Sequence, residues 1–115
     1  MKILTIVAVL LALPALAQTS HQNHGAPAPG AGPSTKAYQA ANDRMHRDMA
    51  IAFTGNADRD FAAGMIPHHQ GAIDMAEVVL KYGKDPELRK LAADIIKAQQ
   101  TEIAFKKAWL AKQPK

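Results

Sequence analysis

The sequence predicts an all-α protein, a small antiparallel bundle of three main helices that run up, down and up. Three stretches carry apolar side chains at steps of three and four residues, the spacing of one face of an α-helix. Short polar connections separate these stretches, and such connections place neighbouring helices antiparallel. A dimer that doubles the three helices could complete the bundle, and the sequence leaves the oligomeric state open.

Residues 1–17 are predicted to be a signal peptide. Lys2 supplies a positive charge, residues 3–13 form an apolar stretch, and Ala-Leu-Ala at 15–17 is typical of a cleavage site. The apolar stretch is shorter than the roughly 20 residues that a membrane-spanning helix needs. We therefore expect cleavage after Ala17 and a periplasmic or secreted protein whose mature form has no membrane span.

Residues 18–36 are predicted to form a disordered linker, because glycine, proline and small polar residues cannot bury enough apolar surface to fold. His21 and His24 lie in this segment. The sequence leaves open whether they are simply solvated or help to capture a metal. The helical domain is expected to span residues 37–113.

The first helix is predicted from about Thr35 to Ala52. Ser34 or Thr35 can cap its start, and Gly55 can supply the left-handed residue that ends it. Its apolar face consists of residues at helical spacing: Tyr38, Ala41, Met45, Met49 and Ala52.

The second helix is predicted to begin near Asp58 or Asp60 and to run to Tyr82, where Gly83 stops it. Pro67 lacks a backbone donor and clashes with the preceding turn, so we expect it to start the helix or to kink it. The predicted buried stripe combines apolar residues with one histidine: Phe61, Met65, His68, Ala72, Met75, Ala76 and Val79.

The third helix has the clearest start signal. Asp85 can cap it, Pro86 suits the first helical position, and Glu87 complements the helix dipole. Its apolar face comprises Leu88, Leu91, Ala92, Ile95, Ile103, Trp109 and Leu110. Three polar residues also fall in the stripe of Leu88 and Ile95, and they need partners there: Gln99, Glu102 and Lys106.

In two antiparallel helices, residues that are equally far from the connecting turn lie side by side. The positions of the two predicted turns therefore indicate which residues lie at the same height along the bundle. Reflection about residue 55 places Met45 and His46 opposite Met65. Reflection about residue 84 places Gln99 and Gln100 opposite the two adjacent histidines at 68 and 69, with Glu102 near residues 65 and 66. One end of the bundle is therefore predicted to hold a site.

Thioether and imidazole side chains gather in this region, and together they suit copper, particularly the soft Cu(I) ion. The candidate metal residues are Met45, His46, Met49, Met65, His68, His69 and Met75. Adjacent histidines point about 100° apart on a regular helix, so we expect one primary ligand and one supporting residue or ligand of a second ion. Gln99 and Glu102 are expected to orient the imidazoles. Each methionine taken alone also fits a helical core.

Several chemistries have no matching pattern. The sequence lacks Glu-x-x-His, His-Glu-x-x-His and Cys-x-x-Cys-His, and it has no cysteine. Of its 14 lysine and arginine residues, 13 remain after removal of Lys2, against 10 acidic residues, and they are spread along the chain. Nucleic-acid binding needs a concentrated basic surface. We expect neither catalysis nor nucleic-acid binding.

The segment from Asp58 to Ala76 resembles a block of the domain-of-unknown-function 305 family, with Asp-x-Asp-Phe-x-x-x-Met-Ile-Pro-His-His-Gln-x-Ala-x-x-Met-Ala. A second block matches Ile95, Gln99, Glu102, Ile103, Trp109 and Leu110. The resemblance implies a ferritin-like helical bundle and an exported protein associated with copper, and sometimes silver, binding and resistance. It also implies metal roles for Met65, His68, His69 and Met75, with helix-one partners Met45, His46 and Met49. Lys106 stands where the family often has methionine.

The leading hypothesis is a periplasmic protein that sequesters, buffers or transfers Cu(I), with Cu(II) and Ag(I) as further candidates and with other periplasmic copper-handling proteins as candidate partners. Two alternatives are a non-catalytic helical interaction module of the cell envelope and a bundle that binds haem non-covalently through histidine and methionine. The sequence leaves the copper oxidation state and the ion count open.

Overall fold

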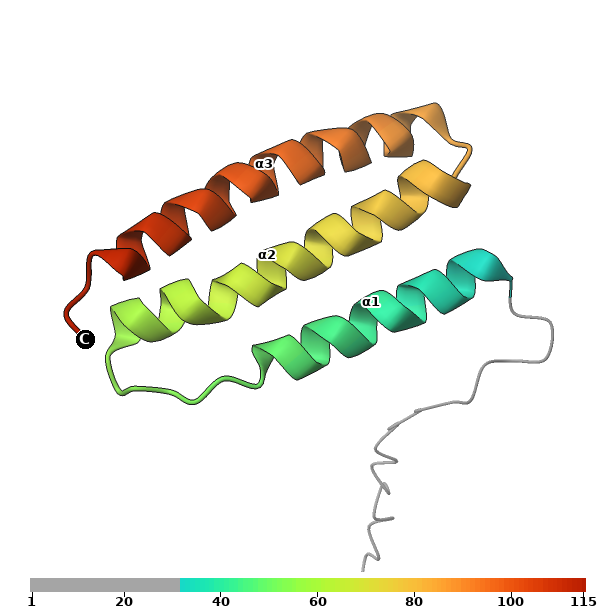
Figure 1. The fold of residues 1–115 in the computed structure, drawn as a ribbon. Coiled ribbons are helices and arrows are strands. Elements are labelled where there is room, and N and C mark those ends of the chain that lie inside the picture. Colours follow the sequence, from blue (N-terminus) through green and yellow to red (C-terminus); the bar gives the residue numbers. More distant parts are fainter. Residues whose placement is uncertain (1–31) are drawn as a thin grey trace, which may run out of the picture.

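The computed structural model describes residues 32–115, which form three α-helices: α1 (Pro33–Met49), α2 (Ala57–Tyr82) and α3 (Pro86–Ala111). The helices run up, down and up, so the predicted all-α antiparallel bundle is confirmed (Figure 1). The predicted signal peptide, His21, His24 and most of the predicted linker lie outside the described residues. None of the three helices contains an 18-residue stretch apolar enough to cross a membrane.

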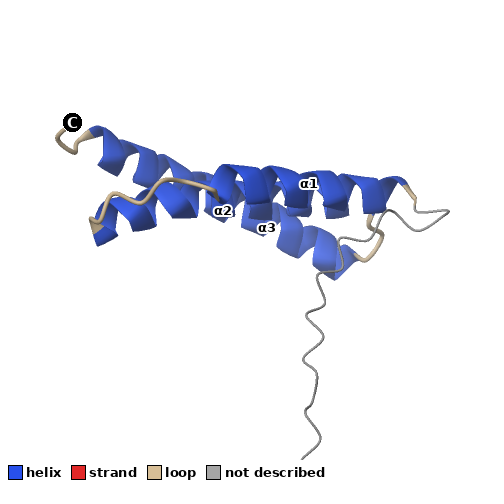
Figure 2. Ribbon diagram, turned by 90° about the horizontal axis from the view of Figure 1, so that it is seen from below, coloured by secondary structure: helices blue, strands red, loops and turns tan. Residues whose placement is uncertain are grey.

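The three helices lie side by side in one layer, with α2 in the middle (Figures 1 and 2). α2 packs against both neighbours, whereas no Cα atom of α1 comes within 8 Å of a Cα atom of α3. The layer therefore has two open faces, and no large side chain within residues 32–115 is fully buried.

α1 differs from its predicted bounds at both ends. It begins at Pro33, ahead of the predicted domain boundary at residue 37, with Gly32 rather than Ser34 or Thr35 at the N-cap position. Proline suits the first helical position because its missing N–H has no helical partner there. The helix ends at Met49, and Gly55 lies in the following loop with a φ of +85°.

The loop between α1 and α2 is held by the carboxylate of Asp60. The Thr54 amide and hydroxyl donate to Asp60 Oδ1 at 2.9 and 2.8 Å, and the Gly55 amide donates to Oδ2 at 3.2 Å. The backbone hydrogen bond from Thr54 is the main cause that lowers the pKa of Asp60 below its ordinary value of 3.8. Asp60 therefore sets the path by which the chain returns from α1 to α2.

Asp60→Ala is expected to lower the urea midpoint of unfolding at neutral pH, because three loop donors lose their acceptor. A carboxyl group whose pKa is lower in the folded state stabilises the fold fully above its ordinary pKa and stops doing so as the pH falls through the folded pKa. The midpoints of parent and variant should therefore converge below about pH 3.8. Asp58→Ala, in the same helical turn, is the control; an equal loss in both variants would contradict the role given to Asp60.

α2 begins one residue before the predicted range and ends where predicted. The Asn56 side chain accepts a hydrogen bond from the Arg59 amide at 3.1 Å, and Gly83 follows the last helical residue in an extended conformation. Pro67 lies inside α2, so the expectation that it starts the helix is wrong. The carbonyl of Ala63 loses its usual helical donor at this level, because proline has no N–H.

α3 begins as the sequence predicts. Asp85 Oδ1 accepts a hydrogen bond from the Leu88 amide at 2.9 Å, Pro86 is the first helical residue, and Glu87 lies in the first turn. Arg89 joins α3 to the end of α2, because its Nη1 donates to the carbonyl oxygens of Leu80 at 2.6 Å and Gly83 at 3.1 Å. These contacts fix the short turn between the two long helices.

The predicted buried stripe of α2 is correct for Ala76, which is buried, and wrong for three of its other residues. Phe61 is 63% exposed, Met75 is 42% exposed and His68 is exposed, whereas the neighbouring His69 is buried. The reason is that α2 packs against neighbours on two sides, so its buried residues follow two contact lines rather than one stripe. The buried residues of the three helices are Ala41, Ala62, His69, Gly71, Ile73, Ala76, Val78, Ala92, Ile103 and Lys106.

Candidate metal centre

The contact between α1 and α2 is closest where Met45 packs on Gly71. A Cβ atom added to Gly71 would lie 2.5 Å from Met45 Sδ, so a larger residue at this position would displace the Met45 side chain. Two turns earlier, a Cβ atom added to Gly64 would lie 3.6 Å from Ile51 Cδ1, an ordinary contact. An ion pair also joins the two helices, with 3.3 Å between Arg44 Nε and Asp74 Oδ2.

The prediction that Met45 and His46 lie opposite Met65 is therefore wrong. Met45 lies opposite Gly71, because α1 ends early and a non-helical connection carries the chain to α2. Met65 instead shares a groove of about 220 Å³ with Met49 and Ile51. His46 is exposed on α1.

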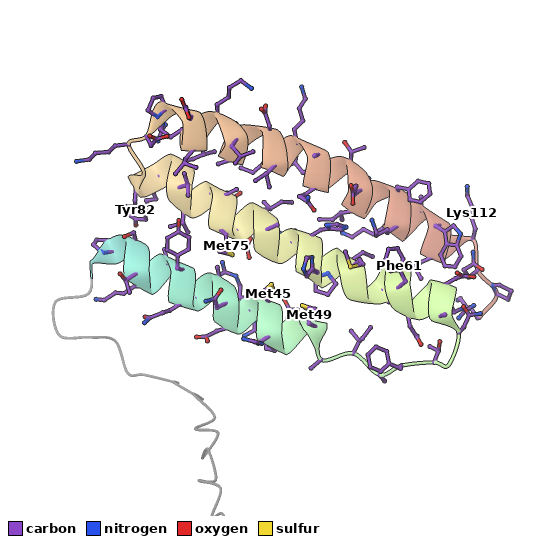
Figure 3. All side chains as sticks on the ribbon, turned by 180° about the vertical axis from the view of Figure 1, so that it is seen from behind. Met45, Met49, Phe61, Met75, Tyr82 and Lys112 are labelled. Atoms are coloured by element: carbon purple, nitrogen blue, oxygen red, sulfur yellow. The ribbon has the colours of Figure 1, made fainter. Side chains whose placement is uncertain are left out.

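Each of the four methionines in residues 32–115 belongs to α1 or α2. Figure 3 shows Met45, Met49 and Met75 in a row where these two helices face each other. Met45 and Met65 are half-buried, while Met49 and Met75 are more exposed. We call this line of side chains the methionine seam and define it as Met45, Met49, Met65, His68 and Met75.

The two adjacent histidines lie on different sides of α2. His68 follows Gly64 by four residues and precedes Gly71 by three, so it lies on the side of the helix that meets α1. His69 is 7% exposed and faces α3, with 2.9 Å between its Nε2 and Glu102 Oε2. The two imidazole rings have centroids 6.0 Å apart and planes at 80°.

Glu102 lies between two basic groups in the contact of α2 with α3. Its Oε2 accepts a hydrogen bond from Lys106 Nζ at 3.2 Å, and Lys106 is buried, with Nζ 5.9 Å from the centre of the Phe61 ring. The short contact between Glu102 and His69 Nε2 is not aligned as a hydrogen bond, so Nε2 has no hydrogen-bond partner among the described residues.

Reflection about residue 84 predicts the α2–α3 register to within a helical turn. It places Glu102 near Met65 and Ile66, and the structure places it against His69. Gln99 is half-buried, and its Oε1 atom has no hydrogen-bond partner in the described part of the chain. Of the two residues expected to orient an imidazole, Glu102 therefore contacts one and Gln99 has no hydrogen bond to either.

The α1–α2 contact and the α2–α3 contact carry different kinds of possible metal ligand. Within residues 32–115, no group of three or more histidine, cysteine, aspartate or glutamate side chains could hold a metal ion. The side chains that gather are thioethers, with the imidazole of His68 on the same side of α2. Thioether sulfur is a soft ligand that selects Cu(I) among the first-row metals.

Sequence reasoning missed the residues that bring α1 against α2. Gly64 and Gly71 are spaced by seven residues, two helical turns, and this spacing is a visible signal of a close helix contact. The Arg44–Asp74 ion pair was also missed, and Gln70 supports it by donating from Nε2 to Asp74 Oδ1 at 3.0 Å.

Comparison with known proteins finds a family that covers nearly the whole chain. A family model described as a domain of unknown function (DUF305) matches residues 8–110. A stretch of 46 residues is 48% identical to an uncharacterized protein of Acanthamoeba polyphaga mimivirus. This match covers 40% of the present chain and 30% of the viral protein, so the chain spans under a third of that relative.

Proposed function

The chain belongs to the domain-of-unknown-function 305 family, and we propose that it binds copper in the methionine seam. Cu(I) is the proposed ion, and Cu(II) and Ag(I) are secondary candidates. The proposed role is to sequester, buffer or transfer the ion in the periplasm, and so to contribute to copper tolerance or trafficking. Binding, rather than catalysis, is the proposed activity.

One observation carries the proposal, namely that four thioethers line up where α1 faces α2. A methionine on a helix usually fills the core, yet Met49 and Met75 leave two-fifths of their surface exposed. An exposed thioether contributes little to packing but remains available to a soft ion. The same residues are therefore better suited to hold an ion than to fill the interior.

Chelation is the proposed mechanism. Met45 and Met49 of α1, and Met65 and Met75 of α2, would hold the soft ion through their thioether sulfur atoms. Met65 and Met75 are ten residues, about 15 Å, apart along α2, so they would belong to two ions rather than one. The His68 imidazole would add a nitrogen ligand from the α1-facing side of α2. His69 would act differently, since Glu102 and Lys106 surround it on the side of α3. Other periplasmic copper-handling proteins are the proposed donors or acceptors of the ion.

An anaerobic Cu(I) titration against a competing chromophoric chelator tests the proposal. The parent protein should compete for the ion. Met45→Leu/Met49→Leu keeps the volume of both side chains and removes both sulfur atoms of α1. Loss of a residue that only orients a metal ligand lowers metal affinity by up to about 100-fold. Loss of two ligands should therefore lower the Cu(I) affinity by about 100-fold or more. His68→Ala should also weaken binding.

His69→Ala is the matched control, because the adjacent position lies on the other side of the helix. We expect its effect on affinity to be smaller than that of His68→Ala. Copper should also raise the unfolding temperature of the parent protein, because a ligand that binds only the folded state stabilises it. A parent protein that cannot compete and shows no such rise would overturn the copper proposal and favour the helical interaction module.

A further inference from the structure

An apolar groove of about 310 Å³ crosses one face of the helical layer, with side chains contributed by all three helices. Two of its alanines, Ala76 and Ala92, are the most deeply buried residues of the lining. Larger side chains rise around them: Tyr38, Met75, Val79, Leu88, Leu91 and Ile95. No charged residue lines the groove.

At this groove the sequence predicts buried apolar side chains, whereas the single chain leaves some of them exposed. Leu88 and Leu91 belong to the apolar stripe of α3, yet they are 56% and 53% exposed. A regular apolar stripe on a helix normally faces a packing partner. In the single layer, α1 and α3 leave the middle of this face uncovered.

We infer that a second copy of this chain packs on the groove, face to face, in a two-fold symmetric dimer. The groove is self-complementary, because it offers both projecting side chains and a hollow of small residues. Two copies related by a two-fold axis present the same patch to each other, so Leu88 and Leu91 of one can fill the alanine hollow of the other. None of the residues that line the groove is charged, so filling the groove would not desolvate a charge of its lining.

The size of the face fits this partner. α2 and α3 have 26 residues each and are about 39 Å long, whereas α1 has 17 residues and is about 26 Å long. With neighbouring helix axes about 9 Å apart, the face between the outer axes measures on the order of 600 Å² per copy, at the lower end of the roughly 600–1,000 Å² that each partner contributes to a stable interface.

The part of this chain that precedes α1 is a poor alternative occupant. After the predicted cleavage site at Ala17, residues 18–31 contain no apolar side chain larger than alanine or proline. Such a segment cannot supply the large apolar groups that the groove would bury. A second copy offers leucines, isoleucine, valine and tyrosine on a rigid helical frame.

Sedimentation equilibrium of the full chain, as its expression host processes it, tests the inference. The parent should have twice the mass of one chain at the higher concentrations and should dissociate on dilution. Leu88→Glu/Leu91→Glu should have the mass of one chain, because four carboxylates would meet at the two-fold contact. Both positions are half exposed in one chain, so the helical circular dichroism signal should remain.

Phe53→Glu is the matched control, because Phe53 is 79% exposed in the α1–α2 loop and does not line the groove. This variant should remain dimeric. The chain has no cysteine, so Leu91→Cys and Phe53→Cys provide a second measurement with a short bifunctional maleimide. Efficient cross-linking of Leu91→Cys alone supports the dimer. A parent that stays monomeric, or a Leu88→Glu/Leu91→Glu variant that stays dimeric, overturns it.

Discussion

Gly71→Val is expected to lower the free energy of unfolding by about 3 kcal/mol, the upper end of what overpacking a helix contact costs. An added Cβ atom would overlap Met45 Sδ at 2.5 Å and crowd Met45 Cγ at 3.0 Å. Valine adds two further carbon atoms, so either the Met45 side chain must leave its position or α1 must move away from α2. Both changes would displace the Met45 thioether from the methionine seam, and we expect Cu(I) affinity to fall with stability. Urea unfolding and the chelator titration measure the two effects.

Gly64→Ala is the control for this prediction. The added methyl group would make an ordinary 3.6 Å contact with Ile51, and alanine favours a helix over glycine by about 0.5–1 kcal/mol. This variant should therefore be more stable than the parent. Gly71→Val/Met45→Ala should recover part of the lost stability, because it removes the overlapping sulfur. Equal stability of Gly71→Val and the parent would show that the close approach of Met45 is not important.

Glu102→Ala is expected to lower the free energy of unfolding by about 1–2 kcal/mol at neutral pH. It removes the one carboxylate that contacts the ammonium group of buried Lys106 and the imidazole of His69. Breaking a fully buried ion pair costs about 3–5 kcal/mol, but Glu102 is 53% exposed and solvent screens part of its interaction. Thermal or urea unfolding measures the loss.

Lys106→Met tests the same contact from the other side. Replacing a buried charged residue with an apolar residue of similar volume is often neutral or stabilising, so this variant should unfold no more easily than the parent. Lys107→Met, at the next and exposed position, is the control and should change stability by less than about 0.5 kcal/mol. If Lys106→Met destabilises the protein more than Glu102→Ala does, the ammonium group itself must stabilise the α2–α3 contact.

The sequence predicts the elements of the fold well where local chemistry decides. The cap at Asp85, the proline that follows it and the stop at Gly83 are local signals, and the structure confirms each of them. The end of α1 was predicted too late. Gly55 does adopt a left-handed conformation, but it lies in the loop after α1 and not at the end of the helix. Its amide donates a hydrogen bond to Asp60 there.

The arrangement of the candidate site was harder to predict, because it depends on register and on which neighbour each side of α2 meets. Reflection about residue 55 holds only for a tight turn between the two helices. The connection from Met49 to Ala57 is longer, so Met45 lies at the level of Gly71 and not at the predicted level of Met65. The periodicity of α2 predicted one buried stripe with His68 inside it. A helix between two neighbours has two contact lines, and that arrangement buries His69 instead.

The position of α1 at the edge of the layer has a consequence for the motion of the chain. Within residues 32–115 the backbone of α1 packs against α2 and not against α3, so α1 can detach while the α2–α3 hairpin keeps its own contacts. Local unfolding should therefore cost less free energy for α1 than for the α2–α3 hairpin. The proposed copper site lies between these two parts of the chain. An ion that bridges this boundary would slow the detachment of α1, and detachment of α1 would in turn release the ion. Metal binding and the detachment of α1 would thus be coupled equilibria.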